Sequence, residues 1–302
     1  MELHQLRYFA KVAQLGSFTR AAEACSVSQP SLSQQIIKLE RDLGRPLFER
    51  LGKRILLTEA GHRLKPLADQ VLRLVEEVKD RIDDDQDAGR LVVAAPPTVV
   101  PYFLTRVLSE FTRRFPKAQV EVVEEVTASI VRKCLDFEID LAVLPLPIGH
   151  HDLRVEPLFE EELLVLLPAG HPLAKKAKVT LKDLQDEPFI LLNDAHCLTG
   201  SALGFCQQRR FRPIITSRVN QLATIQELVS LGQGVSLVPA MARAADASTL
   251  RVYRSLAGER PTRTLGLVRQ SHRIPSPLAD QFMRTIHELS READVRADAV
   301  RT

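Results

Sequence analysis

Residues 17–50 read S-F-T-R-A-A-E-A-C-S-V-S-Q-P-S-L-S-Q-Q-I-I-K-L-E-R-D-L-G-R-P-L-F-E-R, and this stretch decides the fold of the first part of the chain. Ser17 is a good N-cap for a short helix that the apolar spacing predicts over residues 18–25. After a turn, a second helix with Pro30 in its first turn runs to Gly44. Two short helices joined by a tight turn are predicted to form a helix-turn-helix.

The outward side of the second helix is polar but poor in the Glu and Lys of an ordinary solvated face. Such side chains can hydrogen-bond base edges and phosphates in a major groove. The following residues 46–50 and 54–58 are expected to form two short strands of a basic wing that meets the phosphate backbone. The candidate DNA contacts are Ser28, Gln29, Pro30, Ser31, Ser33, Gln34, Lys38, Arg50, Lys53 and Arg54.

The charge distribution supports a polyanion-binding head. The chain carries a net charge of +3, but residues 1–65 hold eleven Lys and Arg against six Asp and Glu, whereas the remainder is near neutral. Residues 1–5 do not have the basic-then-apolar pattern of a secretory signal, so none is expected, and no apolar run approaches the roughly 18 residues that span a bilayer. Four cysteines in 302 residues make no disulfide framework, which favours a reducing cytoplasm.

A long helix is predicted after Thr58 and Glu59. Its apolar residues recur at steps of three and four, which is typical of a coiled-coil seam, although packing on its own domain is the alternative. They are Leu64, Leu67, Val71, Leu74, Val78 and Ile82. Residues 83–89, D-D-D-Q-D-A-G, stop the pattern and are expected to act as a hinge.

From Arg90 onward, strand-like apolar runs alternate with helical patterns. This alternation predicts a mainly parallel sheet with helices on both faces, in two α/β lobes with chain crossings near residues 162 and 267. A ligand would bind in the cleft between the lobes. The strand-like runs cover residues 91–95, 120–123, 141–144, 163–167, 189–192, 214–219, 235–238 and 264–268.

Residues 193–206, N-D-A-H-C-L-T-G-S-A-L-G-F-C, contain two of the four cysteines. A thiolate is the reactive form of cysteine, and a neighbouring His or a helix N-terminus favours it; a second thiol can trap an oxidised cysteine as a disulfide. The alternative is that both are small buried hydrophobes. The segment lacks the C-x2-C spacing of zinc and thioredoxin-type sites. Cys25 and Cys134 are expected on apolar helix faces.

The pattern S-F-T-R-A-A-E…V-S-Q-P-S-L-S-Q-Q-I-I-K-L-E-R-D-L-G-R-P-L-F-E-R resembles the winged helix of LysR-type transcriptional regulators. The resemblance implies a DNA-binding domain at 1–65, a dimerising linker helix at 66–87 and a two-lobed α/β effector domain at 88–302 similar to periplasmic solute-binding proteins. Lobe I would comprise about 88–162 and 268–302, and lobe II about 163–267. It also implies binding to duplex DNA and RNA polymerase, and assembly as a dimer of dimers.

Within this family, residues 196–206 resemble the redox loop of hydrogen-peroxide sensors. This resemblance implies a peroxidatic Cys197 and a resolving Cys206. Because Cys206 follows the apolar residues 202–205, which are expected to form a turn, it is expected to be the more buried of the two. The resemblance also implies peroxide-orienting roles for His196, Thr98 and Thr127, and charge stabilisation by Arg263, without cofactor or metal. Thr199-Gly200 departs from the Arg-Asp pair of better-known sensors. The alternatives are a LysR-type regulator that binds a metabolite between its lobes and a thiol peroxidase.

Overall fold

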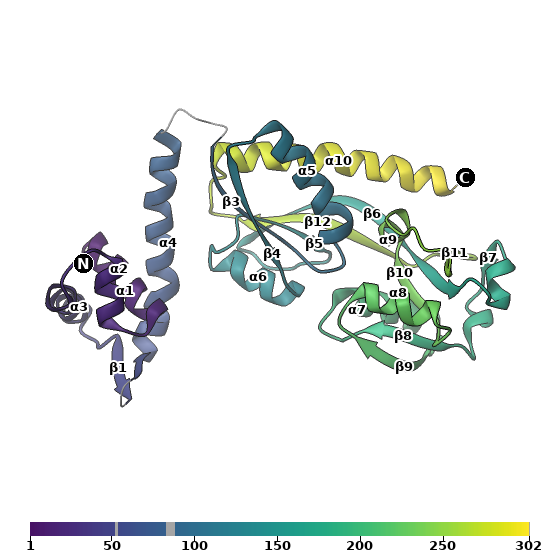
Figure 1. Ribbon diagram of the computed structural model, residues 1–302, viewed down its shortest axis with the longest axis horizontal. Coiled ribbons are helices and arrows are strands. Elements are labelled where there is room, and N and C mark those ends of the chain that lie inside the picture. Colours follow the sequence, from purple (N-terminus) through teal and green to yellow (C-terminus); the bar gives the residue numbers. More distant parts are fainter. Residues whose placement is uncertain (52–53, 83–87, 302) are drawn as a thin grey trace. The chain divides into compact units, whose positions relative to one another are not determined.

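The computed structural model describes residues 1–51, 54–82 and 88–301, which form two compact units, Met1–Asp84 and Asp85–Thr302 (Figure 1). Each unit has its own hydrophobic core. Within the described residues, none of the helices combines the length and the apolar composition needed to cross a membrane.

The N-terminal unit begins with the predicted helix-turn-helix. Ser17 caps α2 by accepting a hydrogen bond from the backbone of Arg20, and Ser28 caps α3 in the same way. Gly44 ends α3 with a φ of 68°, a left-handed conformation that glycine adopts without strain. The elements are α1 (Leu3–Leu15), α2 (Phe18–Ala24), α3 (Gln29–Leu43), β1 (Phe48–Leu51), β2 (Arg54–Leu57) and α4 (Glu59–Ile82).

The core of this unit is formed by the inward faces of the first three helices and the start of α4. Phe9, Leu32 and Leu39 are fully buried in it. Cys25 was expected on the apolar face of its helix, but it lies at the C-cap of α2 and is only half-buried. The helix ends one residue earlier than the apolar spacing predicts, so the Cys25 side chain leaves the buried face.

Lobe I of the second unit is a sheet with a hydrophobic core on each face. Helices α5 and α10 cover one face of the sheet and α6 covers the other (Figure 1). Side chains alternate between the faces, so Val93 belongs to the core with Val107, Phe111 and Phe282 and Ala94 to the core with Ile130 and Cys134. The lobe I elements are β3 (Gly89–Ala95), the π-helical η1 (Val100–Leu104), α5 (Thr105–Arg114), β4 (Ala118–Glu124), α6 (Thr127–Leu135), β5 (Leu141–Pro145) and α10 (Pro277–Arg301).

Two long strands connect the lobes, and they make the sheet mixed rather than mainly parallel. β6 (Leu153–Pro168) and β12 (Thr262–Gln270) pair with each other in antiparallel register, and β12 is also antiparallel to β5. Only the pairs of β3 with β4 and β5, of β8 with β9, and of β11 with β7 are parallel among the described strands. The alternating pattern of strands and helices does not reveal the direction in which the two connecting strands run.

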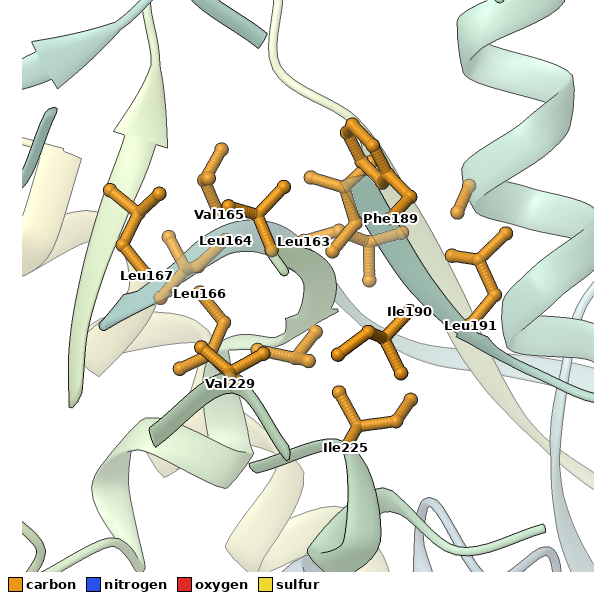
Figure 2. Packing of buried hydrophobic residues seen from close by; sticks show 14 of the residues in the cluster. Leu163, Leu164, Val165, Leu166, Leu167, Phe189, Ile190, Leu191, Ile225 and Val229 are labelled. Atoms are coloured by element: carbon orange, nitrogen blue, oxygen red, sulfur yellow. The ribbon is translucent and has the colours of Figure 1, made fainter. Parts of the chain in front are cut away.

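Lobe II is built on the second half of β6. Leu163 to Leu167 are all buried, on both sides of the strand, in one cluster with Phe189, Ile190, Ile225 and Val229 (Figure 2). The lobe II elements are η2 (Pro172–Lys175), β7 (Lys178–Val179), η3 (Lys182–Leu184), β8 (Pro188–Leu192), α7 (Cys197–Gln208), β9 (Ile214–Val219), α8 (Leu222–Ser230), β10 (Ser236–Pro239), α9 (Ala240–Ala244) and β11 (Arg251–Leu256).

Candidate functional site

Cys197 is the first residue of helix α7. The chain leaves the buried strand β8 at Leu192, and the turn that follows is closed by a hydrogen bond from the His196 N–H to the Asn193 carbonyl, at 3.0 Å. His196 then occupies the N-cap with extended backbone angles. The Cys197 side chain is partly exposed at a helix N-terminus, where unpaired N–H groups and the helix dipole favour negative charge.

A hydroxyl group from the other lobe contacts the Cys197 sulfur. Thr127 begins helix α6 of lobe I, and its Oγ1 donates to the Cys197 Sγ at 3.4 Å. The N-termini of two helices therefore meet at one sulfur atom. This arrangement can stabilise a thiolate and can also offer a hydrogen bond to a small polar oxidant beside it.

His196 is buried, with 7% of its surface exposed. Burial lowers the pKa of its imidazole, because removal from water disfavours the charged form. The side chain is therefore neutral at neutral pH and offers a hydrogen bond rather than a positive charge.

Thr98 and Arg263 form a second cluster. The Arg263 guanidinium is buried, and it donates to the Thr98 hydroxyl at 3.0 Å and to the Thr98 carbonyl at 3.1 Å. Its charge is matched by Glu161, whose carboxylate lies 2.6 Å away. Among the described hydrogen bonds of Arg263, none reaches the Cys197 sulfur. The direct effect of Arg263 is thus to fix Thr98, next to the π-helical turn η1.

Cys206 lies on the same helix but in a different environment. Only 2% of its surface is exposed, within the lobe II core, and burial raises the pKa of its thiol to about 11. The turn expected at residues 202–205 is absent, because α7 continues without a break from Cys197 to Gln208. Nine helical residues separate the two Cα atoms by about 13 Å, whereas a disulfide needs about 7 Å or less.

The Thr199-Gly200 departure from the better-known sequence pattern has a local structural role. The buried Thr199 Oγ1 donates to the carbonyl of Leu192 at 2.8 Å and so ties the first turn of α7 to the end of β8. Gly200 and Gly204 lie inside the helix, and an added Cβ at either would meet no atom within 4 Å. Their packing does not require glycine.

The candidate nucleic-acid interface is the polar face of α3. Gln29, Pro30, Ser31, Gln34 and Lys38 are exposed, and Ser28 is the exposed N-cap. Ser33 is half-buried and accepts a hydrogen bond from Gln29 at 2.8 Å. In the wing, Lys53 and the side chains of Arg50 and Arg54 lie outside the described residues, so the expected phosphate contacts there stay predictions.

Helix α4 exposes an apolar stripe. Leu67, Val71, Leu74 and Val78 are exposed by 39% to 59%, at the predicted spacing of three and four residues. Ala68, on the inward side of the same helix, packs in the core of the N-terminal unit. The inward side holds the helix to its own unit, and the stripe is left to face solvent or a partner.

The sequence did not reveal Glu161 as part of this site. Glu161 precedes the apolar run at residues 163–167, and it lies 102 residues from Arg263 along the chain. Its backbone pairs with Arg263 across β6 and β12, which places both side chains in the interior. The one feature of the sequence that could have indicated this role is a carboxylate next to an apolar, buried strand.

Comparisons with known proteins cover almost the whole chain. Residues 3–62 match the bacterial regulatory helix-turn-helix protein, lysR family, and residues 84–291 match the LysR substrate binding domain. The DNA-binding transcriptional dual regulator OxyR of Escherichia coli K12 is 33% identical over 99% of this chain and 98% of its own length. A probable hydrogen peroxide-inducible genes activator of Mycobacterium avium is 35% identical over 88% and 87%. The transcriptional dual regulator GltC of Bacillus subtilis is 31% identical over 93% and 95%.

Solved structures give the same picture. A full-length cysteine-to-aspartate variant of OxyR from Pseudomonas aeruginosa matches with a TM-score of 0.78 and 30% identity, covering 96% of this chain and 95% of that one. A cysteine-to-serine variant of Corynebacterium glutamicum OxyR with bound hydrogen peroxide matches with a TM-score of 0.65 and 30% identity, covering 99% and 95%.

Proposed function

This chain belongs to the LysR family of bacterial transcriptional regulators, and we propose that it senses hydrogen peroxide by forming a reversible disulfide between Cys197 and Cys206. The observation that carries this proposal is the position of Cys197. It is a partly exposed thiol at a helix N-terminus, with the Thr127 hydroxyl 3.4 Å from its sulfur and a second, buried cysteine nine residues further along. Both solved structures reported above are of OxyR proteins, and one of these was solved with hydrogen peroxide bound.

The first chemical step is oxidation of Cys197. Its thiolate attacks one oxygen of hydrogen peroxide, a sulfur–oxygen bond forms, the oxygen–oxygen bond breaks, and hydroxide leaves to take up a proton as water. Thr127 is placed to donate a hydrogen bond to the thiolate or to the peroxide. Thr98, held by Arg263, is the second hydroxyl that would orient the peroxide. Glu161 and Arg263 act by positioning Thr98.

The second step needs Cys206 to leave the core. Its thiol condenses with the sulfenic acid of Cys197, a sulfur–sulfur bond forms, and water is released. While buried, Cys206 stays protonated because its pKa is about 11, and it is also about 13 Å away along the helix. Opening of α7 must therefore precede or accompany the condensation. A covalent bond that requires a helix to unfold is a suitable input for a two-state switch.

The output of the switch would be DNA binding by the N-terminal unit. We propose that α3 reads base edges, that the basic wing contacts phosphates, and that the α4 stripe joins two chains into a dimer, with two dimers forming the working tetramer. The regulator would act in the reducing cytoplasm, where a disulfide is a transient signal, and would control oxidative-stress genes through RNA polymerase.

The decisive experiment is peptide mapping by mass spectrometry after a stoichiometric pulse of hydrogen peroxide to the reduced full-length protein. We expect one intramolecular bridge, between Cys197 and Cys206, that thiol reductant reverses. Another bridge, or none, would contradict the proposal and favour a metabolite-responsive regulator. Sustained consumption of peroxide with a reductant would instead indicate a thiol peroxidase.

A further inference from the structure

A cluster of imidazoles lies around one carboxylate at the edge of lobe I, outside the cysteine site. Asp152 Oδ2 is 3.1 Å from His151 Nε2 and 3.9 Å from His150 Nδ1. The other carboxylate oxygen, Oδ1, is 3.4 Å from the Nε2 of His272, which is distant in the sequence. Three of the eight histidines of the chain therefore converge on Asp152.

The backbone that carries two of these imidazoles is fixed by hydrogen bonds. His150, His151 and Asp152 form a turn before β6, closed by a bond from the Leu153 N–H to the His150 carbonyl at 3.1 Å. The rings of His150 and His151 stack with their centroids 4.8 Å apart. Both rings therefore project from a hydrogen-bonded turn.

The backbone that carries the third imidazole is fixed from the opposite strand. Leu153 pairs with Gln270 at the ends of β6 and β12, and the Ser271 N–H then donates to the Asp152 carbonyl at 2.7 Å. The buried Gln270 side chain accepts a hydrogen bond from the His272 N–H at 2.5 Å. These bonds fix the backbone from which the His272 imidazole projects.

We propose that His150, His151, Asp152 and His272 form a binding site for a divalent transition-metal ion of the zinc type. His150, His151 and Asp152 each offer one ligand atom, and these atoms lie within 4.8 Å of one another. His272 lies outside this group and reaches it through the other Asp152 oxygen, 3.4 Å from its Nε2. The His150 Nδ1 accepts the Asp152 N–H at 3.2 Å, and a metal bound to this nitrogen would replace that hydrogen bond. Imidazole nitrogens with one carboxylate oxygen are a ligand set that suits zinc in four-fold coordination. Hard ions such as magnesium prefer oxygen ligands, so the site should discriminate against them.

The site is separate from the peroxide chemistry. It lies where β6 begins. Cys206 belongs to the lobe II core that contains Leu163–Leu167, and these residues lie about 30 Å further along the strand at 3.3 Å per residue. A metal ion bound here would cross-link the loop before β6 to the loop after β12. These loops flank the lobe I ends of the two strands that connect the lobes.

Zinc affinity of the reduced full-length protein, measured by competition with a chromophoric chelator, tests the proposal. We expect one zinc ion per chain at this site, with affinity reduced about tenfold or more in His272→Gln and in His150→Gln. The matched control is His287→Gln, because His287 is also paired with a carboxylate, Glu156 at 3.5 Å. The His287→Gln protein should bind zinc with the wild-type affinity, and magnesium should not compete with zinc for the site.

Two further measurements distinguish loss of the metal site from unfolding of the variant and from metal binding by cysteine. The His272 side chain is 74% exposed, so His272→Gln should unfold at the wild-type temperature without metal and lose the zinc-dependent rise in that temperature. Cobalt(II) bound at an imidazole and carboxylate site should lack the sulfur-to-metal charge-transfer absorption of thiolate ligands. Equal zinc affinity in wild type, His272→Gln and His150→Gln, or a thiolate absorption band, would overturn the proposal.

Discussion

At the scale of single residues, Cys197 and Cys206 share a functional group and differ in position. Cys197 is partly exposed at the N-terminus of α7, whereas Cys206 is buried nine residues later, with a thiol pKa of about 11. Accessibility and local electrostatics together decide which thiol reacts first. The expected order of burial, with Cys206 the deeper of the two, agrees with the structure, although the expected turn between them does not.

The order of reaction can be tested with single substitutions. Cys206→Ser should consume one equivalent of peroxide and accumulate a sulfenic acid on Cys197, because the thiol that would trap it is gone. Cys197→Ser should form neither a sulfenic acid nor an intramolecular disulfide. Dimedone labelling followed by intact-mass measurement distinguishes the two. Cys25→Ser is the control and should behave as the wild type; dimedone adducts in Cys197→Ser would contradict the assignment.

Thr127 is the residue whose contribution to the first step is clearest. Its hydroxyl is the one group described as donating to the Cys197 sulfur. Thr127→Val keeps the shape and removes the donor, so the rate of Cys197 oxidation should fall by about tenfold or more. Thr127→Ser keeps the hydroxyl and should recover most of the rate. Stopped-flow kinetics with peroxide measures both, and equal rates in all three proteins would exclude this role.

The contacts of Arg263 could not be predicted from the sequence. The types and positions of Thr98, Thr127 and Arg263 could be proposed from local patterns. The contact of Arg263 with Glu161 depends on the pairing of β6 with β12, which joins residues 102 positions apart, and its contact with Thr98 spans 165 positions. A local pattern does not specify such a pairing.

At the scale of elements, α7 has features of a helix that can open. It contains Gly200 and Gly204, and interior glycines destabilise a helix by roughly 0.5–1 kcal/mol each relative to alanine. It is held at its start by the Thr199 hydrogen bond to Leu192 and along its length by Cys206 and other buried side chains. Apolar contacts thus stabilise a helix of low intrinsic propensity.

Gly200→Ala with Gly204→Ala should therefore slow the second chemical step. Both sites have room for a methyl group, so the substitutions stabilise α7 by about 1–2 kcal/mol in total. Disulfide formation should slow by roughly tenfold, while sulfenic acid formation on Cys197 should keep its rate. Quenched-flow mass spectrometry separates the steps. Gly170→Ala, outside α7 and also with open space, is the control; an unchanged rate of disulfide formation would show that α7 opening does not limit it.

Elements were predicted more reliably than their arrangement. The two helices of the helix-turn-helix were predicted to within one residue at their ends, because caps and apolar spacing are local signals. The strand β6 extends over residues 153–168, whereas only 163–167 was predicted, since its first half is half-exposed and charged. β11 was not predicted, because arginines interrupt its apolar pattern.

At the scale of the whole molecule, the regulator must bind DNA through the N-terminal unit. The logarithm of the DNA-binding constant should fall linearly with the logarithm of salt concentration. Arg50→Ala should reduce that slope by about one unit, because binding then releases fewer counterions from the phosphates. Gln29→Ala should weaken discrimination between operator and unrelated DNA by about 1–3 kcal/mol. Fluorescence anisotropy at several salt concentrations measures both. Arg106→Ala, on α5 and paired with Glu292, is the control; unchanged binding in the Arg50 and Gln29 variants together would exclude this face.

Assembly is expected to depend on the α4 stripe. Leu67 and Leu74 are 59% and 45% exposed, although they are large apolar side chains on a helix of 24 residues. Lysine at both positions would place two unpaired charges in a buried seam, at a cost of about 3 kcal/mol or more. The double variant should sediment as a monomer and bind DNA weakly, because two half-sites are no longer contacted together. His62→Lys, exposed on the same helix but outside the spacing of the stripe, should remain assembled. A double variant that sediments like the wild type would place the contact between chains elsewhere.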